Sequence, residues 1–176
     1  MEHFTAIPIE PWILSGWALV CGGFDVCRRR LPNLLTLGGA AAALAMLVAT
    51  GYGWLETSWS SCTGAAIAAA LLTLPAYAVR RLGAGDVKLL VSMGLLGGLQ
   101  ALSITYVCAG LLVGFITVLW IQAYRWEFWF AYRFAQIGIM DFSIPEPKGR
   151  SLPFGFALAI GFLIAVSDPN IHFLNR

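Results

Sequence analysis

Long apolar stretches separated by short charged segments dominate this sequence, and they predict a series of membrane-crossing helices. A crossing helix uses about 20 mainly apolar residues. Stretches of this kind lie within residues 11–24, 31–55, 57–79, 89–124 and 151–167. Their apolar residues run continuously instead of alternating with polar ones, which argues against the strands of a membrane barrel. The pattern therefore indicates helices.

The stretch 89–124 predicts two crossings rather than one. It holds 36 residues without a charge. A single helix of that length would be about 54 Å long, whereas the hydrocarbon core is ~30 Å thick. The segment Gly97-Gly98-Leu99-Gln100 provides a turn between two helices. We therefore predict an all-α, polytopic membrane protein with a bundle of about six transmembrane helices, in a single domain over residues 1–176.

The composition fits this class and excludes two others. Of the residues, 59% are hydrophobic and only 11% are charged. A soluble domain carries about 25% charged residues, so an ordinary water-facing surface is excluded. A disordered chain is excluded as well, because disorder requires low hydrophobicity. The net charge of +2 gives no sign of a nucleic-acid partner, and the sequence leaves the oligomeric state open.

We expect neither a metal nor a cofactor. The cysteines form no CxxC pair and show no zinc-ligand spacing. We interpret them as small apolar side chains within the bundle. They are Cys21, Cys27, Cys62 and Cys108. The two histidines, His3 and His172, stand near the two ends of the chain.

Lysine and arginine gather in alternate loops, which predicts the orientation in the membrane. With six crossings, the loops after the first, third and fifth lie on one side and both termini lie on the other. Ten of the 11 basic residues fall in those loops, within 28–30, 80–88 and 125–150. Because cytoplasmic loops carry the excess of lysine and arginine, we expect a multi-pass protein of the inner (cytoplasmic) membrane with both termini outside.

Two aspartates lie at the cytoplasmic edge of this predicted bundle. Asp25 ends the first crossing and Asp86 begins the fourth. Two crossings return the chain to its starting side, so both carboxylates are expected at one depth. An ionisable group in a membrane segment indicates function by default. The structural alternatives are that Asp25 only marks a helix end and that Asp86 only caps the fourth helix.

Two nearby carboxylates suit aspartic proteolysis. Like charges at short distance cannot both ionise cheaply, so such a pair tends to hold one proton. The ionised member takes a proton from water as the water attacks the scissile carbonyl, and the protonated member polarises that carbonyl and assists the leaving amine. Whether Asp25 and Asp86 face each other does not follow from the topology.

Both aspartates stand in segments that resemble motifs of one family. Gly83-Ala84-Gly85-Asp86 resembles the GxGD motif of intramembrane-type aspartyl proteases. The segment from Asp25 through three arginines to Leu31-Pro32-Asn33 resembles the first aspartate motif of type IV prepilin peptidases. Leu152-Pro153-Phe154-Gly155 resembles the opening of that family's last helix. The resemblance covers residues 11 to 167, nearly the whole chain.

This resemblance implies a membrane aspartic endopeptidase that removes the short basic leader of prepilins or pseudopilins at the cytoplasmic membrane face. Asp25 and Asp86 are then the catalytic pair. An active-site loop and supporting motif positions follow from the same resemblance, and we expect Lys88 to lie at the membrane interface. The loop residues are Gly83, Ala84, Gly85 and Lys88, and the supporting positions are Pro32, Asn33 and Pro153.

The larger, bifunctional members of the family carry an extra cytoplasmic segment, often with paired CxxC cysteines, that has no counterpart here. We therefore expect no separate N-terminal methyltransferase or zinc segment, and N-methylation with S-adenosylmethionine stays open. The compact form resembles the peptidases of tight-adherence (Flp) pilus systems and the archaeal preflagellin peptidases.

Residues 124–150 are expected to form a long cytoplasmic loop. Its first part, from Tyr124 to Phe134, interleaves aromatic residues with arginine. This mixture is typical of an amphipathic helix in the membrane interface and predicts contact with membrane lipids. The alternative is a docking surface for the prepilin.

Three other functions fit parts of the sequence. Lys88 and Ser92 are four residues apart and share a helical face, as a Ser–Lys pair of a serine-type membrane protease would. A transporter or channel would use the aspartates as a proton relay, although the interiors of the apolar stretches hold no charge. A structural membrane subunit would tolerate the loss of either aspartate.

Overall fold

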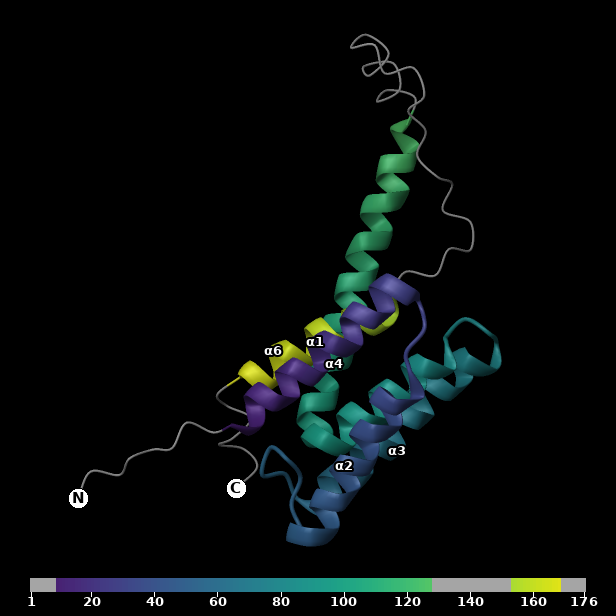
Figure 1. Cartoon of the computed structure of the whole chain (residues 1–176). Coiled ribbons are helices and arrows are strands. Elements are labelled where there is room, and N and C mark those ends of the chain that lie inside the picture. The colour runs from purple at the N-terminus through teal and green to yellow at the C-terminus, as the bar shows by residue number, and fades with distance from the viewer. Residues whose placement is uncertain (1–8, 128–152, 169–176) are drawn as a thin grey trace, which may run out of the picture. The chain divides into compact units, whose positions relative to one another are not determined.

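The computed structural model describes residues 9–127 and 153–168, and within them the chain forms five α-helices (Figure 1). The all-α class predicted from the sequence is confirmed for this part of the chain. Short turns connect the first four helices. The helices are α1 (Glu10–Arg28), α2 (Asn33–Thr50), α3 (Trp59–Ala78), α4 (Ala84–Arg125) and α6 (Phe154–Ser167).

Three of the described helices, α2, α3 and α4, are long and apolar enough to cross a membrane. Helix α6 is apolar but has only 14 residues. Helix α1 has 19 residues and carries Glu10, Asp25 and Arg28. The described residues therefore do not reach the predicted six crossings, because the first and last apolar stretches are short or charged and the fourth and fifth are joined in one element.

That joined element, α4, breaks at the position where the sequence predicts a turn. Gly98 has φ 73° and ψ −172°, far from helical values. A positive φ of this size favours glycine, which has no Cβ atom to clash with the backbone. The amide of Leu99, freed by the break, donates a hydrogen bond to Ser61 Oγ at 3.0 Å. The 42 residues of α4 are thus two helical segments, as expected from its length.

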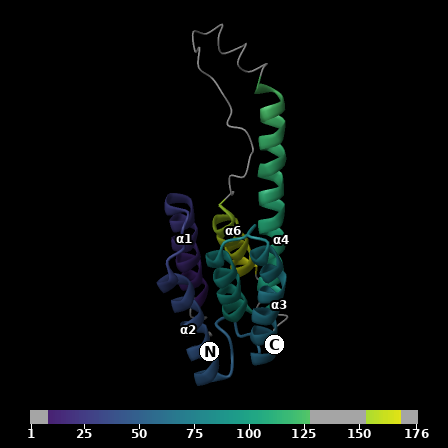
Figure 2. The same ribbon diagram turned by 90° about the vertical axis from the view of Figure 1, so that its right-hand side faces the viewer.

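Helix α1 lies beside α6 (Figure 1, Figure 2). Gly22 lets the two backbones approach, because a Cβ atom there would lie 2.9 Å from Ala159 Cβ. Trp17 connects the same pair to α2. Its indole Nε1 donates to the carbonyl of Leu35 at 3.1 Å, and its ring meets the ring of Phe162 edge-on at 6.2 Å.

Helix α6 also packs closely against α4. A Cβ atom on Gly161 would collide with the backbone carbonyl of Thr105. In the segment of α4 before the break, a Cβ atom on Gly94 would lie 3.1 Å from the carbonyl carbon of Ala65 in α3. Small residues at helix contacts allow the close packing that holds membrane helices together.

The chain divides into two compact units, one formed by Met1–Ala109 with Pro153–Arg176 and the other by Gly110–Leu152. In the second unit the described residues are the C-terminal end of α4 and the two residues after it. All residues of the candidate site belong to the first unit.

The close contact at Gly161 gives a test of the packing. We expect Gly161→Ala to lower the free energy of unfolding by about 1–3 kcal/mol, because the added methyl group strains a fixed backbone contact. Denaturant titration in detergent micelles measures the change. Gly64→Ala is the matched control, since a Cβ atom at Gly64 meets nothing within 4 Å. Equal stability of the two variants would contradict the packing of α6 on α4.

Candidate active site

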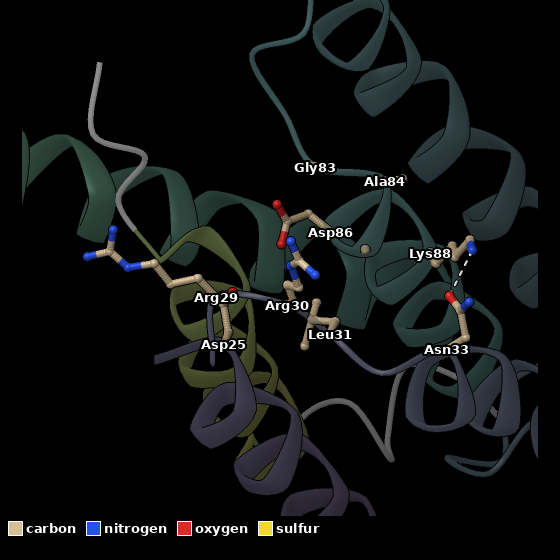
Figure 3. Close-up of a pocket in the computed structure, with 10 residues that line it drawn as sticks. Asp25, Arg29, Arg30, Leu31, Asn33, Gly83, Ala84, Asp86 and Lys88 are labelled. Carbon is tan, nitrogen blue, oxygen red and sulfur yellow. Dashed lines mark hydrogen bonds between the residues drawn. The ribbon is translucent and has the colours of Figure 1, made fainter. Parts of the chain in front are cut away.

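A pocket of about 340 Å³ opens where the turn between α1 and α2 meets the start of α4 (Figure 3). The two segments that resemble family motifs supply its walls. Both aspartates line it, together with three cationic side chains. The lining residues are Asp25, Arg29, Arg30, Leu31, Asn33, Gly83, Ala84, Gly85, Asp86 and Lys88.

Asp25 projects from the last turn of α1 and is buried, with 8% of its surface exposed. Its Oδ2 atom accepts a hydrogen bond of 3.0 Å from the backbone amide of Phe156. Phe156 is the third residue of α6, so its amide is among those that find no partner within the helix. The Asp25 carboxylate therefore satisfies an amide at the N-terminus of a second helix, α6.

Asp86 is the third residue of α4. Its backbone amide donates to the carbonyl of Gly83 at 3.1 Å. Its carboxylate turns back over the loop, where a Cβ atom on Gly83 would lie 3.2 Å from Oδ2. The glycine thus leaves room for the carboxylate.

The two carboxylates meet at Gly155. A Cβ atom built on Gly155 would lie 2.9 Å from Oδ2 of Asp25 and 3.2 Å from Oδ1 of Asp86. The sequence predicts only a common depth for these two groups. The structure adds that they come from α1 and α4 and lie against one α-carbon of α6.

Contacts between the two motif segments hold the pocket together. Gly85 sits against Leu31, whose Cβ atom lies 3.1 Å from the place of a glycine Cβ. Nζ of Lys88 donates a hydrogen bond of 3.0 Å to Oδ1 of Asn33 (Figure 3). Pro32 is the N-cap of α2, whose first residue is Asn33. Lys88 therefore has a partner in the other motif, which interfacial placement alone would not require.

A model of one protein family matches residues 12–119, more than half of the chain. The chain belongs to the type IV leader peptidase family. The matched range contains both aspartates and the GxGD-like loop, and it ends before α6. Neither the curated proteins nor the solved structures include a match to this chain.

Several residues at the site of this leader peptidase family member were not expected from the sequence. Arg29 and Arg30 line the pocket beside the aspartates, and Arg29 adopts a left-handed conformation with φ 49°. Gly155 and Phe156 contact the carboxylates from α6. The resemblance of 152–155 to a family helix points to this segment, in which Pro153 forms the N-cap of α6.

The serine-protease alternative gains no support from the geometry. Ser92 is buried, and its hydroxyl lies 2.7 Å from the backbone carbonyl oxygens of Thr36 and Lys88. The ammonium group of Lys88 is bound to Asn33 instead. The Ser92 hydroxyl therefore bonds to backbone carbonyls, and its proton is not directed at the amine of Lys88.

Two expectations remain predictions. The aromatic loop of residues 124–150 lies outside the described residues from 128 onward. Within 9–127 and 153–168 no three His, Cys, Asp or Glu side chains gather to hold a metal. The expected absence of a metal or cofactor is not decided by this observation.

The contact between Lys88 and Asn33 is testable through a double-mutant cycle. We expect Lys88→Met and Asn33→Ala to show a coupling of about 0.2–1 kcal/mol in the free energy of unfolding, the range of exposed charged contacts. Denaturant titration of the single and double variants in micelles gives this value. Strictly additive losses would show that the two motif segments are not linked through these side chains.

Proposed function

We propose that the protein is a membrane aspartic endopeptidase that removes the short basic leader peptide of prepilins or prepilin-like proteins. Asp25 and Asp86 are its catalytic pair. Membership of the type IV leader peptidase family supports a leader-cleaving protease. The observation that carries the aspartic mechanism is the approach of both carboxylates to Gly155.

The reaction needs one carboxylate in its ionised form and one in its protonated form. The ionised group accepts a proton from a water molecule while the water oxygen forms a bond to the scissile carbonyl carbon. The protonated group donates a hydrogen bond to the carbonyl oxygen as it gains negative charge. Collapse of the tetrahedral intermediate breaks the carbon–nitrogen bond, and the proton taken from water passes to the leaving amine. The carboxylates then return to their starting states.

The charges around the pocket bear on how a basic leader would bind. Arg29, Arg30 and Lys88 line the same pocket as the carboxylates. Like charges repel, so lysine and arginine residues of the leader are expected to stay outside the pocket. The scissile peptide bond, which is uncharged, would then be the part of the substrate that reaches Asp25 and Asp86.

The apolar helices and the family indicate a membrane protein. We further propose a multi-pass protein of the inner membrane, with six crossings, both termini outside and the active site at the cytoplasmic face. The asymmetry of lysine and arginine among the loops supports this orientation. Membrane lipids and a prepilin or pseudopilin are then its partners, and the compact form resembles the tight-adherence and preflagellin peptidases.

The dyad predicts a specific loss of activity. We expect Asp25→Asn and Asp86→Asn each to lower the rate of prepilin cleavage by at least about 1,000-fold, because the two groups act as a unit and an amide cannot accept and return the proton. The measurement is the mobility shift of a co-expressed prepilin on a gel.

Two control variants separate this mechanism from its alternatives. Glu10→Gln removes an acid from the exposed, opposite end of α1 and should leave cleavage intact. Ser92→Ala should also cleave, whereas a serine protease would lose its nucleophile. Near wild-type processing by Asp25→Asn would show that the aspartic mechanism is wrong.

The topology predicts which loops reagents reach from outside the cell. After replacement of the four native cysteines by serine, we expect a membrane-impermeant thiol reagent to label Glu56→Cys in intact cells and to leave Arg81→Cys unlabelled. The first lies in the loop between α2 and α3, and the second in the loop between α3 and α4. Labelling of Arg81→Cys in intact cells would reverse the proposed orientation.

A further inference from the structure

Helix α6 lies outside the residues matched by the family model, yet its first turn contacts both aspartates. We propose that the N-terminus of α6 belongs to the active site and positions the two carboxylates. In this proposal Gly155 sets the spacing of the two carboxylates, and the backbone amide of Phe156 holds Asp25 in its reactive orientation. The inference rests on the dyad proposed above and adds two positioning residues to it.

Gly155 is needed for its missing side chain and not for its backbone conformation. Within the described residues the glycines with a positive φ are Gly51 and Gly98, so Gly155 has no conformation reserved for glycine. A methyl group on Gly155 would lie 2.9 Å from Oδ2 and 3.0 Å from Cγ of Asp25, and 3.2 Å from Oδ1 of Asp86. Each distance is shorter than ordinary van der Waals contact, which starts at 3.4 Å. Any side chain here would push the carboxylates apart.

The amide of Phe156 orients Asp25. A carboxylate on a single bond to its helix can rotate, and the hydrogen bond of 3.0 Å from this amide fixes one of its oxygens. The donor lies in the first turn of α6, where the helix dipole adds partial positive charge. Asp86, Arg29, Arg30 and Lys88 are the other charged groups that line the pocket. The oxygen not bound by Phe156 is left for water or for the shared proton.

The placement of α6 explains how it can hold the pair. The helix contacts α1, which carries Asp25, through Ala159 against Gly22. It contacts the segment of α4 that carries Asp86 through Phe162 against Gly97, and the segment after the break through Gly161 against Thr105. One rigid helix is therefore packed on both helices that supply the carboxylates. Its N-terminus keeps a fixed position between their side chains.

The first test compares two alanine variants at the contact between α1 and α6. We expect Gly155→Ala to lower kcat by about 100-fold, since a small misplacement of reacting groups has effects of that size, while KM stays within twofold of wild type. Gly22→Ala is the matched control, because its added methyl group also meets a neighbour at 2.9 Å but lies against Ala159 and not against a carboxylate. Both enzymes are assayed in micelles with a purified prepilin, and their unfolding temperatures are measured in parallel.

The second test removes the amide donor of Phe156. Nonsense suppression replaces Phe156 by phenyllactic acid, which keeps the side chain and turns the N–H group into an ester oxygen. We expect kcat to fall about 10- to 100-fold, as for loss of a hydrogen bond to a charged group. The same replacement at Phe162, inside α6 and fully buried, is the control for damage to the helix. The ester variant at Phe162 should have a higher kcat than the ester variant at Phe156.

The outcomes separate this inference from the dyad itself. Cleavage by Asp25→Asn or Asp86→Asn would overturn the dyad. If those variants are inactive but Gly155→Ala and the Phe156 ester cleave with normal kcat, only the role of α6 is wrong. The role of α6 is also wrong if Gly155→Ala loses activity only in proportion to its unfolding, as Gly22→Ala does. If Gly155→Ala does not fold, the comparison of the esters at Phe156 and Phe162 decides.

Discussion

The structure depends on the approach of two acidic side chains, carried by different helices, to one point in an apolar bundle. Two carboxylates at such a distance repel each other when both are ionised, so they do not attract their helices into place. Other contacts must hold them. The amide of Phe156 binds Asp25, the Gly83 loop accommodates Asp86, and the missing side chain of Gly155 leaves the space between them.

Close packing of small residues supplies the rigidity that this arrangement requires. In a bilayer the lipid tails are as apolar as the side chains, so helices associate through packing and hydrogen bonds and not through burial from water. Gly22, Gly94 and Gly161 each mark a close approach between two helices. This close packing matters most for α6, because the helix has only 14 residues and packs on both α1 and α4.

The sequence predicts the parts of the site that follow from chain topology and local pattern. The common depth of Asp25 and Asp86 and the break near Gly98 both depend on features within one or two helices. The contacts of Gly155 and Phe156 with the carboxylates do not depend on local features. They arise only when a helix about 130 residues away packs on α1. The hydrogen bond between Lys88 and Asn33 is also tertiary, so the sequence does not predict it. The count of six crossings rests on hydrophobic length, and three of the described helices are long and apolar enough to cross a membrane.

The central claim is that the side chains of residues 25 and 86 share one site, and cross-linking tests it most directly. Asp25→Cys and Asp86→Cys are combined in a chain whose four native cysteines are serine, and the membranes are treated with a mild oxidant or a short thiol cross-linker. We expect a rapid intramolecular cross-link between the two positions, identified by mass spectrometry. Glu10→Cys with Asp86→Cys, at the far end of α1, should give none. Absence of the link between positions 25 and 86, with both thiols reactive to a small maleimide, would contradict the account.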